Sequence, residues 1–301
     1  MISHESTKAR NQINLYRVFV FSWLAIATAT VAPLSAQQTF TGRLSDSACA
    51  ASHQSKAASA HLTDRACLFA CINALAKYVL VDSEGQVLAI ANQDAMGLPL
   101  YAGRPVRISG ERKGDAIVVA KVESVPAHLH LGHVMTNWRD TPGTRGFLPV
   151  AIDEARVAVL HAELAAKSAS LEDIRLHAGH VLHALDPGLE PKGPGAGYGV
   201  KKASAGAQQH LDFAAKAEGA TAAISTNATH VSTSLADVLQ DVDLAVAAAQ
   251  RIGTATDVAD ARQAAADLAV LTRRISADGL QRAQTAMGVI LKAEGLLGAP
   301  R

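Results

Sequence analysis

The strongest constraint on the fold is a long amphipathic stripe in the second half of the chain, between residues 222 and 252. Apolar residues recur along it at alternating steps of four and three, the spacing that keeps one face of an α-helix apolar. Such a stripe must be buried against other helices, as in the seam of a helical bundle. It consists of Ile224, Ala228, Val231, Leu235, Val238, Val242, Ala245, Ala249 and Ile252.

The same periodicity predicts further helices on both sides of this one. Aromatic residues make up only 4% of the chain while alanine is abundant, which favours close packing of helices. Short connections between helices favour antiparallel neighbours, so we expect residues 127–301 to form an antiparallel α-helical bundle. The expected ranges are 148–167, 171–185, 200–217, 257–277 and 279–297.

Residues 38–126 have a different pattern, with short alternating or apolar runs separated by turn residues. About five strands and one helix, over 64–76, are expected there, which suits a small OB-like β-barrel. Pro126 marks the boundary, so the chain is predicted to be an α+β protein of two domains. The expected strands are 39–44, 78–81, 86–90, 105–110 and 116–122.

A short histidine phrase occurs twice in the second domain and is echoed a third time. Imidazole is the commonest transition-metal ligand, and inward imidazoles on facing helices build metal and haem sites in bundles. The valine of each copy aligns with the apolar stripe, which places the histidines at or beside the core. The copies read Leu129-His130-Leu131-Gly132-His133-Val134, Leu176-His177-Ala178-Gly179-His180-Val181 and Asn227-Ala228-Thr229-His230-Val231.

The histidines shared by all three copies, His133, His180 and His230, are the first candidates for a cofactor site, followed by His130 and His177. His183 and His210 are further metal candidates, and His161 lies on a neighbouring predicted helix. Two imidazoles can be the axial ligands of haem b, whereas three or four can hold zinc, copper or nickel. No Cys-x-x-Cys-His motif occurs, which excludes covalent c-type haem attachment.

A second interpretation assigns these histidines to packing. Buried histidines often act as hydrogen-bonded spacers between helices, and a duplicated helix would carry such a residue twice without binding anything. A pH-responsive role, based on titration near neutrality, is a third interpretation.

A stretch rich in glycine and proline, residues 186–199, connects the second histidine helix to the next. Glycines before a helix N-terminus, with lysines nearby, can hold an anion through backbone amides. Gly197, Gly199, Lys201 and Lys202 are therefore candidates for binding a phosphate, a haem propionate or a carboxylate. The alternative is a rigid crossover with no ligand.

The three cysteines all lie in the first domain. Cys49 and His53 are followed by Cys67 and Cys71, which share a face if residues 64–76 are helical. Together the four side chains form a Cys3His set suited to tetrahedral zinc. The alternatives are a disulfide between Cys49 and one of the other two cysteines, and a redox-active thiol.

The first domain resembles small exported domains of uncharacterised bacterial proteins. The resemblance covers roughly 85 residues and rests on Ser45-Asp46-Ser47-Ala48-Cys49, the later cysteine pair and the strand Tyr78-Val79-Leu80-Val81. It implies an OB-like barrel and brings no activity with it. The chain departs from the pattern at Ala50, where glycine is more usual.

Residues 1–36 have the plan of a secretory signal peptide. Lys8, Arg10 and Arg17 precede a short apolar run, and Leu34-Ser35-Ala36 offers a cleavage site. An uncleaved anchor helix is the alternative, although the run is short for a membrane span. We expect an exported protein, periplasmic or secreted, with no membrane span after cleavage.

These features narrow the function without naming it. A net charge of +1 gives no general reason to expect nucleic-acid binding, and no common catalytic motif stands out, so an enzyme has weak support. The leading hypothesis is an exported histidine-rich protein that holds a transition metal or haem in its bundle. The alternative is a structural or interaction module of the cell envelope that binds a protein partner and uses its histidines for packing.

Overall fold

The computed structural model describes residues 37–52 and 64–296. Over these ranges the protein is α+β, with a five-stranded sheet followed by a set of helices. The predicted signal peptide and His53 lie outside the described residues.

The first half forms an antiparallel sheet with one parallel pairing, between β3 and β5. Hydrogen-bonded neighbours follow the closed order β1-β2-β3-β5-β4, with β4 pairing back to β1. Each predicted strand is present, and β1, β4 and β5 extend beyond their predicted ranges. The strands are β1 (Gln38–Asp46), β2 (Tyr78–Val81), β3 (Val87–Ile90), β4 (Pro105–Lys113) and β5 (Ala116–Ser124).

Two helices interrupt the sheet. The predicted helix is α1 (Asp64–Asn73), and a single turn, α2 (Leu98–Tyr101), was not predicted. Their apolar side chains join those of the strands in a hydrophobic core that is separate from the core of the bundle. Fully buried members of this first core include Leu44, Leu68, Leu80, Leu98 and Ile108.

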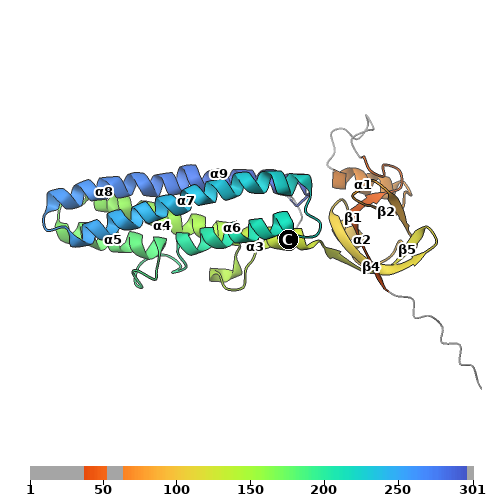
Figure 1. Cartoon of the computed structure of the whole chain (residues 1–301), viewed down its shortest axis with the longest axis horizontal. Helices are drawn as coiled ribbons and strands as arrows, with labels where there is room; N and C mark the ends of the chain where they lie inside the picture. Colours follow the sequence, from red (N-terminus) through yellow and green to blue (C-terminus); the bar gives the residue numbers. More distant parts are fainter. Residues whose placement is uncertain (1–36, 53–63, 297–301) are drawn as a thin grey trace, which may run out of the picture. The chain divides into compact units, whose positions relative to one another are not determined.

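The second half is the predicted helical bundle, whose long helices run alongside one another (Figure 1). The expected ranges 148–167, 171–185 and 200–217 agree with the structure to within one residue at each end. The helices are α3 (Pro126–Met135), the 3-10 turn η2 (Pro142–Thr144), α4 (Phe147–Lys167), α5 (Leu171–Leu185), α6 (Val200–Lys216), α7 (Ala222–Thr254), α8 (Val258–Arg273), the π-helical turn η3 (Arg274–Leu280) and α9 (Gln281–Ala293).

Helix α7 confirms the amphipathic stripe, because all nine of its predicted residues are buried. The helix begins where the sequence provides a cap: the Thr221 hydroxyl accepts a hydrogen bond from the Ile224 amide at 3.2 Å. The Ser170 hydroxyl caps α5 in the same way through the Asp173 amide. Burial of the stripe therefore organises the bundle around α7, which contacts α5, α6, α8 and α9.

The last two predicted helices are one continuous helical run with a π-helical turn between them. The sequence placed a break near Asp278 and Gly279, and that prediction was wrong. Gly279 serves close packing here, because a Cβ atom at this position would overlap the Val238 side chain of α7. A π-helical turn adds a residue to the run without ending it, which keeps both α8 and α9 against α7.

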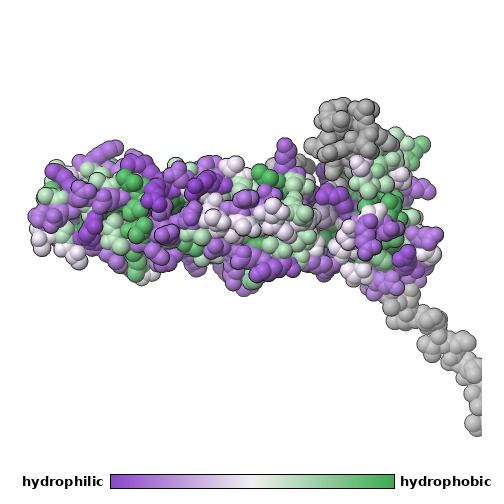
Figure 2. All heavy atoms as spheres, turned by 45° about the horizontal axis from the view of Figure 1, so that its top comes forward, coloured by the Kyte–Doolittle hydropathy of each residue, from purple (hydrophilic) through white to green (hydrophobic). Residues whose placement is uncertain are grey.

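Hydrophilic side chains cover much of the visible face of the bundle, with apolar ones in smaller patches (Figure 2). Among the helices that the structure describes, none combines the length and the apolarity needed to cross a bilayer.

Candidate metal centres

Three histidines from two helices meet in what we call site A. His130 and His133 are three residues apart on α3, so they share a face, and α3 packs against α6, which carries His210. The Nδ1 atom of His210 lies 3.0 Å from Nδ1 of His130 and 3.2 Å from Nδ1 of His133. Three imidazole nitrogens thus converge on one point between the helices.

A second set, site B, repeats this arrangement. His177 and His180 are three residues apart on α5, and α5 packs against α4, which carries His161. The Nδ1 atom of His161 lies 3.1 Å from Nδ1 of His177 and 3.2 Å from Nδ1 of His180. In each site the three ligand atoms lie within 4.8 Å of one another, and each group could hold a metal ion.

Hydrogen bonding alone accounts poorly for either set. A neutral imidazole has one N–H and one lone pair, so a single ring nitrogen forms one good hydrogen bond in the ring plane. In site A the Nδ1 atom of His210 faces two nitrogens, as does that of His161 in site B. A cation placed among the three nitrogens would use one lone pair from each of them at once.

The spacing also suits direct coordination. Zinc–nitrogen bonds of about 2.0–2.1 Å place the nitrogens of a tetrahedral site about 3.3–3.4 Å apart. The separations from His210 in site A and from His161 in site B, 3.0–3.2 Å, are a few tenths of an ångström shorter. Three protein ligands would leave the fourth position of a tetrahedral ion for water or another molecule.

The electrostatics of both sites favour neutral imidazoles, the form that binds metal. Burial lowers the pKa of His210 to about 4, and the nearby rings of His133 and His130 add to the shift. In site B, burial is the main cause of the lowered pKa of His161, followed by His180 and His177. Burial also lowers the pKa values of His130, His133 and His180.

Site A has an aromatic surround. The Trp138 ring lies 4.7 Å from the His133 ring and 4.8 Å from the His210 ring, measured between centroids. Phe147 stacks on His210 at 5.4 Å. Trp138, Phe147 and His210 also line a cavity of about 610 Å³, so a molecule in that cavity would contact one of the site A imidazoles.

Each site is built from histidines of two different sequence repeats. The histidine phrase recurs in α3 and α5, and a second pattern, Ala-x-x-His-x-(Asp or Glu)-x-Ala-Ala-Lys, recurs in α4 from Ala158 and in α6 from Ala207. The chain therefore contains two helix pairs, α3–α4 and α5–α6. Site A joins α3 of the first pair to α6 of the second, and site B joins α5 of the second pair to α4 of the first.

This second pattern is the signal that sequence reasoning missed. It identifies His161 and His210 as equivalent residues, whereas the prediction ranked His230 above both. Among the described residues, the structure gathers five of the predicted candidates into two groups that could hold a metal ion, and it adds His161. These five are His130, His133, His177, His180 and His210.

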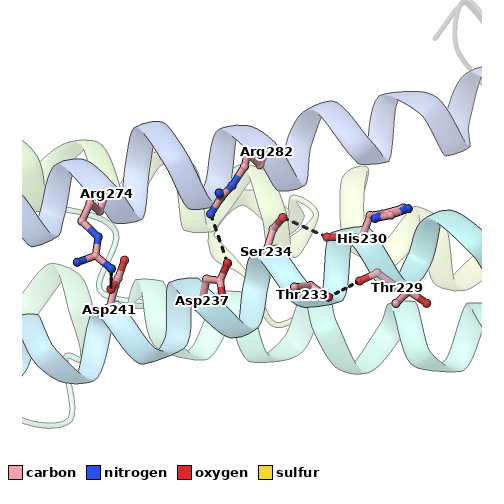
Figure 3. Close-up of polar contacts among 8 residues, drawn as sticks. All are labelled: Thr229, His230, Thr233, Ser234, Asp237, Asp241, Arg274 and Arg282. Atoms are coloured by element: carbon pink, nitrogen blue, oxygen red, sulfur yellow. Dashed lines mark hydrogen bonds and ion pairs between the residues drawn. The ribbon is translucent and has the colours of Figure 1, made fainter.

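His230 is not part of either set. It lies on the exposed side of α7, where the Ser234 hydroxyl donates a hydrogen bond to its backbone carbonyl at 3.1 Å (Figure 3). The same view shows that α7 is tied to the run from η3 to α9 by two ion pairs, Arg274–Asp241 and Arg282–Asp237. The third copy of the phrase, on α7, therefore shares the buried valine, Val231, with the other two copies, but its histidine does not join other ligands within the described ranges.

His128 and His183 show what a packing histidine looks like in this bundle. The buried His128 ring forms a 2.8 Å contact with the carboxylate of Glu294. The buried His183 ring contacts the Glu190 carbonyl at 2.8 Å through Nδ1 and lies under Gly193. His183, a predicted metal candidate, therefore holds the crossover in place and stands apart from its neighbours in site B.

The glycine-rich crossover binds a carboxylate from within the chain. Oε1 of the buried Glu154, on α4, accepts hydrogen bonds from the amides of Tyr198 at 2.8 Å and Gly199 at 3.3 Å, at the start of α6. Lys201 pairs with Asp243, and the Lys202 ammonium lies over the Tyr198 ring. An internal carboxylate occupies the position where the sequence suggested an external anion near Gly197 and Gly199.

Replacing Glu154 with alanine should lower the free energy of unfolding by roughly 2–3 kcal/mol, because two buried amides lose a charged acceptor. Glu154→Gln, which keeps an acceptor oxygen, should lose less. Urea unfolding of both variants measures the effect. Equal stability of Glu154→Ala and the wild type, or recovery of the loss with millimolar phosphate, would contradict an internal structural role.

The predicted cysteine set is also brought together, apart from His53, which lies outside the described residues. The sulfurs of Cys49, Cys67 and Cys71 lie within 4.8 Å of one another, and all three are free thiols.

Comparisons of the chain with known protein families, curated proteins and solved structures found no match.

Proposed function

We propose that this chain is an exported transition-metal-binding protein whose helical bundle holds two ions, one in site A and one in site B. The observation that carries the proposal is the convergence of three imidazole nitrogens, twice in one bundle. In each site one Nδ1 atom lies 3.0–3.2 Å from two others, and all three atoms lie within 4.8 Å of one another. Export rests on the signal-peptide pattern of residues 1–36, and the closed strand order β1-β2-β3-β5-β4 supports the OB-like assignment.

The way in which both repeats contribute histidines to each site favours this proposal over a packing role. A packing histidine needs one partner, as His128 and His183 show. Sites A and B instead each assemble the same three residues, with two from one repeat and one from the other. Duplication explains why there are two sites, whereas a packing role leaves the meeting of three imidazoles in each site unexplained.

The donor set points to zinc, copper or nickel bound directly. Imidazole suits all three metals, and three imidazoles with an open position suit tetrahedral zinc or copper. Haem fits these residues less well. The axial imidazoles of a haem lie on opposite faces of the porphyrin, so their nitrogens are separated by about 4 Å, twice a metal–nitrogen bond, with the ring between them.

The test is metal stoichiometry. The purified full-length protein, loaded with Zn²⁺ and dialysed with its thiols alkylated, should retain two ions per chain by elemental analysis. The double variant His161→Ala/His210→Ala should keep the helical circular dichroism of the wild type and retain none. If the variant loses stability while the alkylated wild type never binds zinc or copper, the envelope interaction module with packing histidines is the better description.

A further inference from the structure

The three cysteines of the first half lie close to one turn, whose backbone is held by side-chain hydrogen bonds. Strand β1 ends at Asp46, whose Oδ1 accepts hydrogen bonds from the amides of Ala48 and Cys49, both at 2.9 Å. The Ser45 hydroxyl donates to the Ala50 carbonyl at 2.6 Å. These bonds fix the backbone on both sides of Cys49, so its side chain has a defined direction.

Ala50 shows how tight this turn is. Its φ of 48° lies in the left-handed region, which glycine adopts more readily than any residue with a Cβ. A turn retained in a strained conformation points to a geometric requirement on the residue before it, Cys49.

Helix α1 supplies the other two thiols. Cys67 and Cys71 are four residues apart, hence on one face of the helix. The Cys49 sulfur lies 3.8 Å from that of Cys67 and 3.6 Å from that of Cys71. Cys67 is buried and the other two are partly exposed, so the group lies at the edge of the hydrophobic core.

The sulfur separations fit a shared ion. Zinc–sulfur bonds of about 2.3 Å place the sulfurs of a tetrahedral site about 3.8 Å apart. A disulfide needs about 2.0 Å, and it could use only one of the two near-equal contacts that Cys49 makes. The distances between the three sulfurs therefore match a metal site better than a disulfide with one unpaired thiol.

We propose that Cys49, Cys67 and Cys71 form a third metal centre, a thiolate site for a soft ion such as zinc(II) or copper(I). Its donors are softer than the imidazoles of sites A and B, so one chain offers two classes of site that prefer different metals. Each thiol that binds releases its proton to solvent as the ion enters. The proposal does not depend on the bundle, because its residues lie in the turn after β1 and in α1.

Cobalt(II) is the probe that separates the two classes. A thiolate-bound Co²⁺ ion gives a sulfur-to-metal charge-transfer band in the near ultraviolet, which an imidazole-bound ion lacks. The reduced full-length protein should show this band at one equivalent, and the double variant His161→Ala/His210→Ala should keep it. Adding Zn²⁺ or Cu⁺ should remove the band by displacing cobalt.

Cys67→Ser and Cys71→Ser should each abolish the band while the circular dichroism stays unchanged. Two variants are used because Cys67 is buried and Cys71 is partly exposed, so at least one should fold. Zinc loading before exposure to air should preserve three thiols per chain by thiol titration. The proposal is overturned if the reduced protein gives no charge-transfer band, or if zinc-loaded protein oxidises to a single free thiol as fast as metal-free protein.

Discussion

Replacing His210 with alanine should empty site A and leave site B intact, and His161→Ala should do the reverse. Each change removes one of three ligands from one site. The affinity of the altered site should fall by more than about 100-fold, because even residues that only support a ligand are worth 10–100-fold. With the thiols alkylated, the wild-type protein should then show two tight equivalents of Cu²⁺ or Zn²⁺ and each variant one.

Trp138 makes it possible to tell which site is filled. Its ring lies 4.7 Å from the His133 ring and 4.8 Å from the His210 ring, whereas the ring contacts of site B involve only its own three histidines in the part of the chain that the structure describes. Bound Cu²⁺ quenches a nearby indole. Copper should therefore quench the fluorescence of His161→Ala, in which site A remains, and spare that of His210→Ala.

Two controls complete this experiment. Trp138→Phe reports any signal from Trp23, the other tryptophan of the chain. His230→Ala removes an exposed histidine outside both sites and should change neither the stoichiometry nor the quenching. Identical quenching of His210→Ala and His161→Ala would show that copper binds elsewhere, and assignment of the two sites would fail.

The fold could be predicted largely because its elements carry local signals. The nine apolar residues of the α7 stripe follow a helical period, and all nine are buried. Helix α5 begins after a serine cap that can be recognised from sequence. The break expected near Gly279 failed for a tertiary reason. A glycine that permits close contact with Val238 looks, in sequence, like a glycine that ends a helix.

The sites were only half predictable for a related reason. The spacing of His130 and His133, or of His177 and His180, is local and fixes which residues share a helical face. The third ligand comes from another repeat. The short connection between α4 and α5 favours their contact, but no local pattern says that α3 packs on α6. His183 continues the same three-residue spacing as His177 and His180, yet its ring contacts the backbone carbonyl of Glu190 in the crossover instead of joining site B.

Without metal, the protein should lose stability as the pH falls from about 6.5 to about 4. His210 has a folded-state pKa of about 4, against an unfolded value near 6.5, so the unfolded chain binds more protons throughout this window. The contribution of His210 is fully present above pH 6.5, and its loss below pH 4 is on the order of 3 kcal/mol. The lowered pKa values of His130, His133, His161 and His180 act in the same direction.

Bound metal should stabilise the folded protein near neutral pH, and this stabilisation should disappear in acid. An ion that binds only the folded state adds about 4 kcal/mol per site when its free concentration is 1,000 times the dissociation constant. Because each ion joins one repeat to the other, the effect should appear as global stabilisation of the bundle. Protons compete for the same nitrogens, so the gain should shrink as the pH approaches the imidazole pKa values.

Urea unfolding between pH 4.5 and 7.5, with EDTA or with Zn²⁺, measures both effects on one protein. Carboxylates also titrate near the acid end, so the decisive quantity is the difference between variants. In protein with alkylated thiols, His210→Asn should make the metal-free profile between pH 4.5 and 6.5 less steep and halve the gain from zinc, whereas the exposed control His230→Asn should change neither. A metal-free wild type whose stability is level across this range would mean that the histidines titrate freely, and the neutral, converging imidazoles on which both sites depend would then be absent in solution.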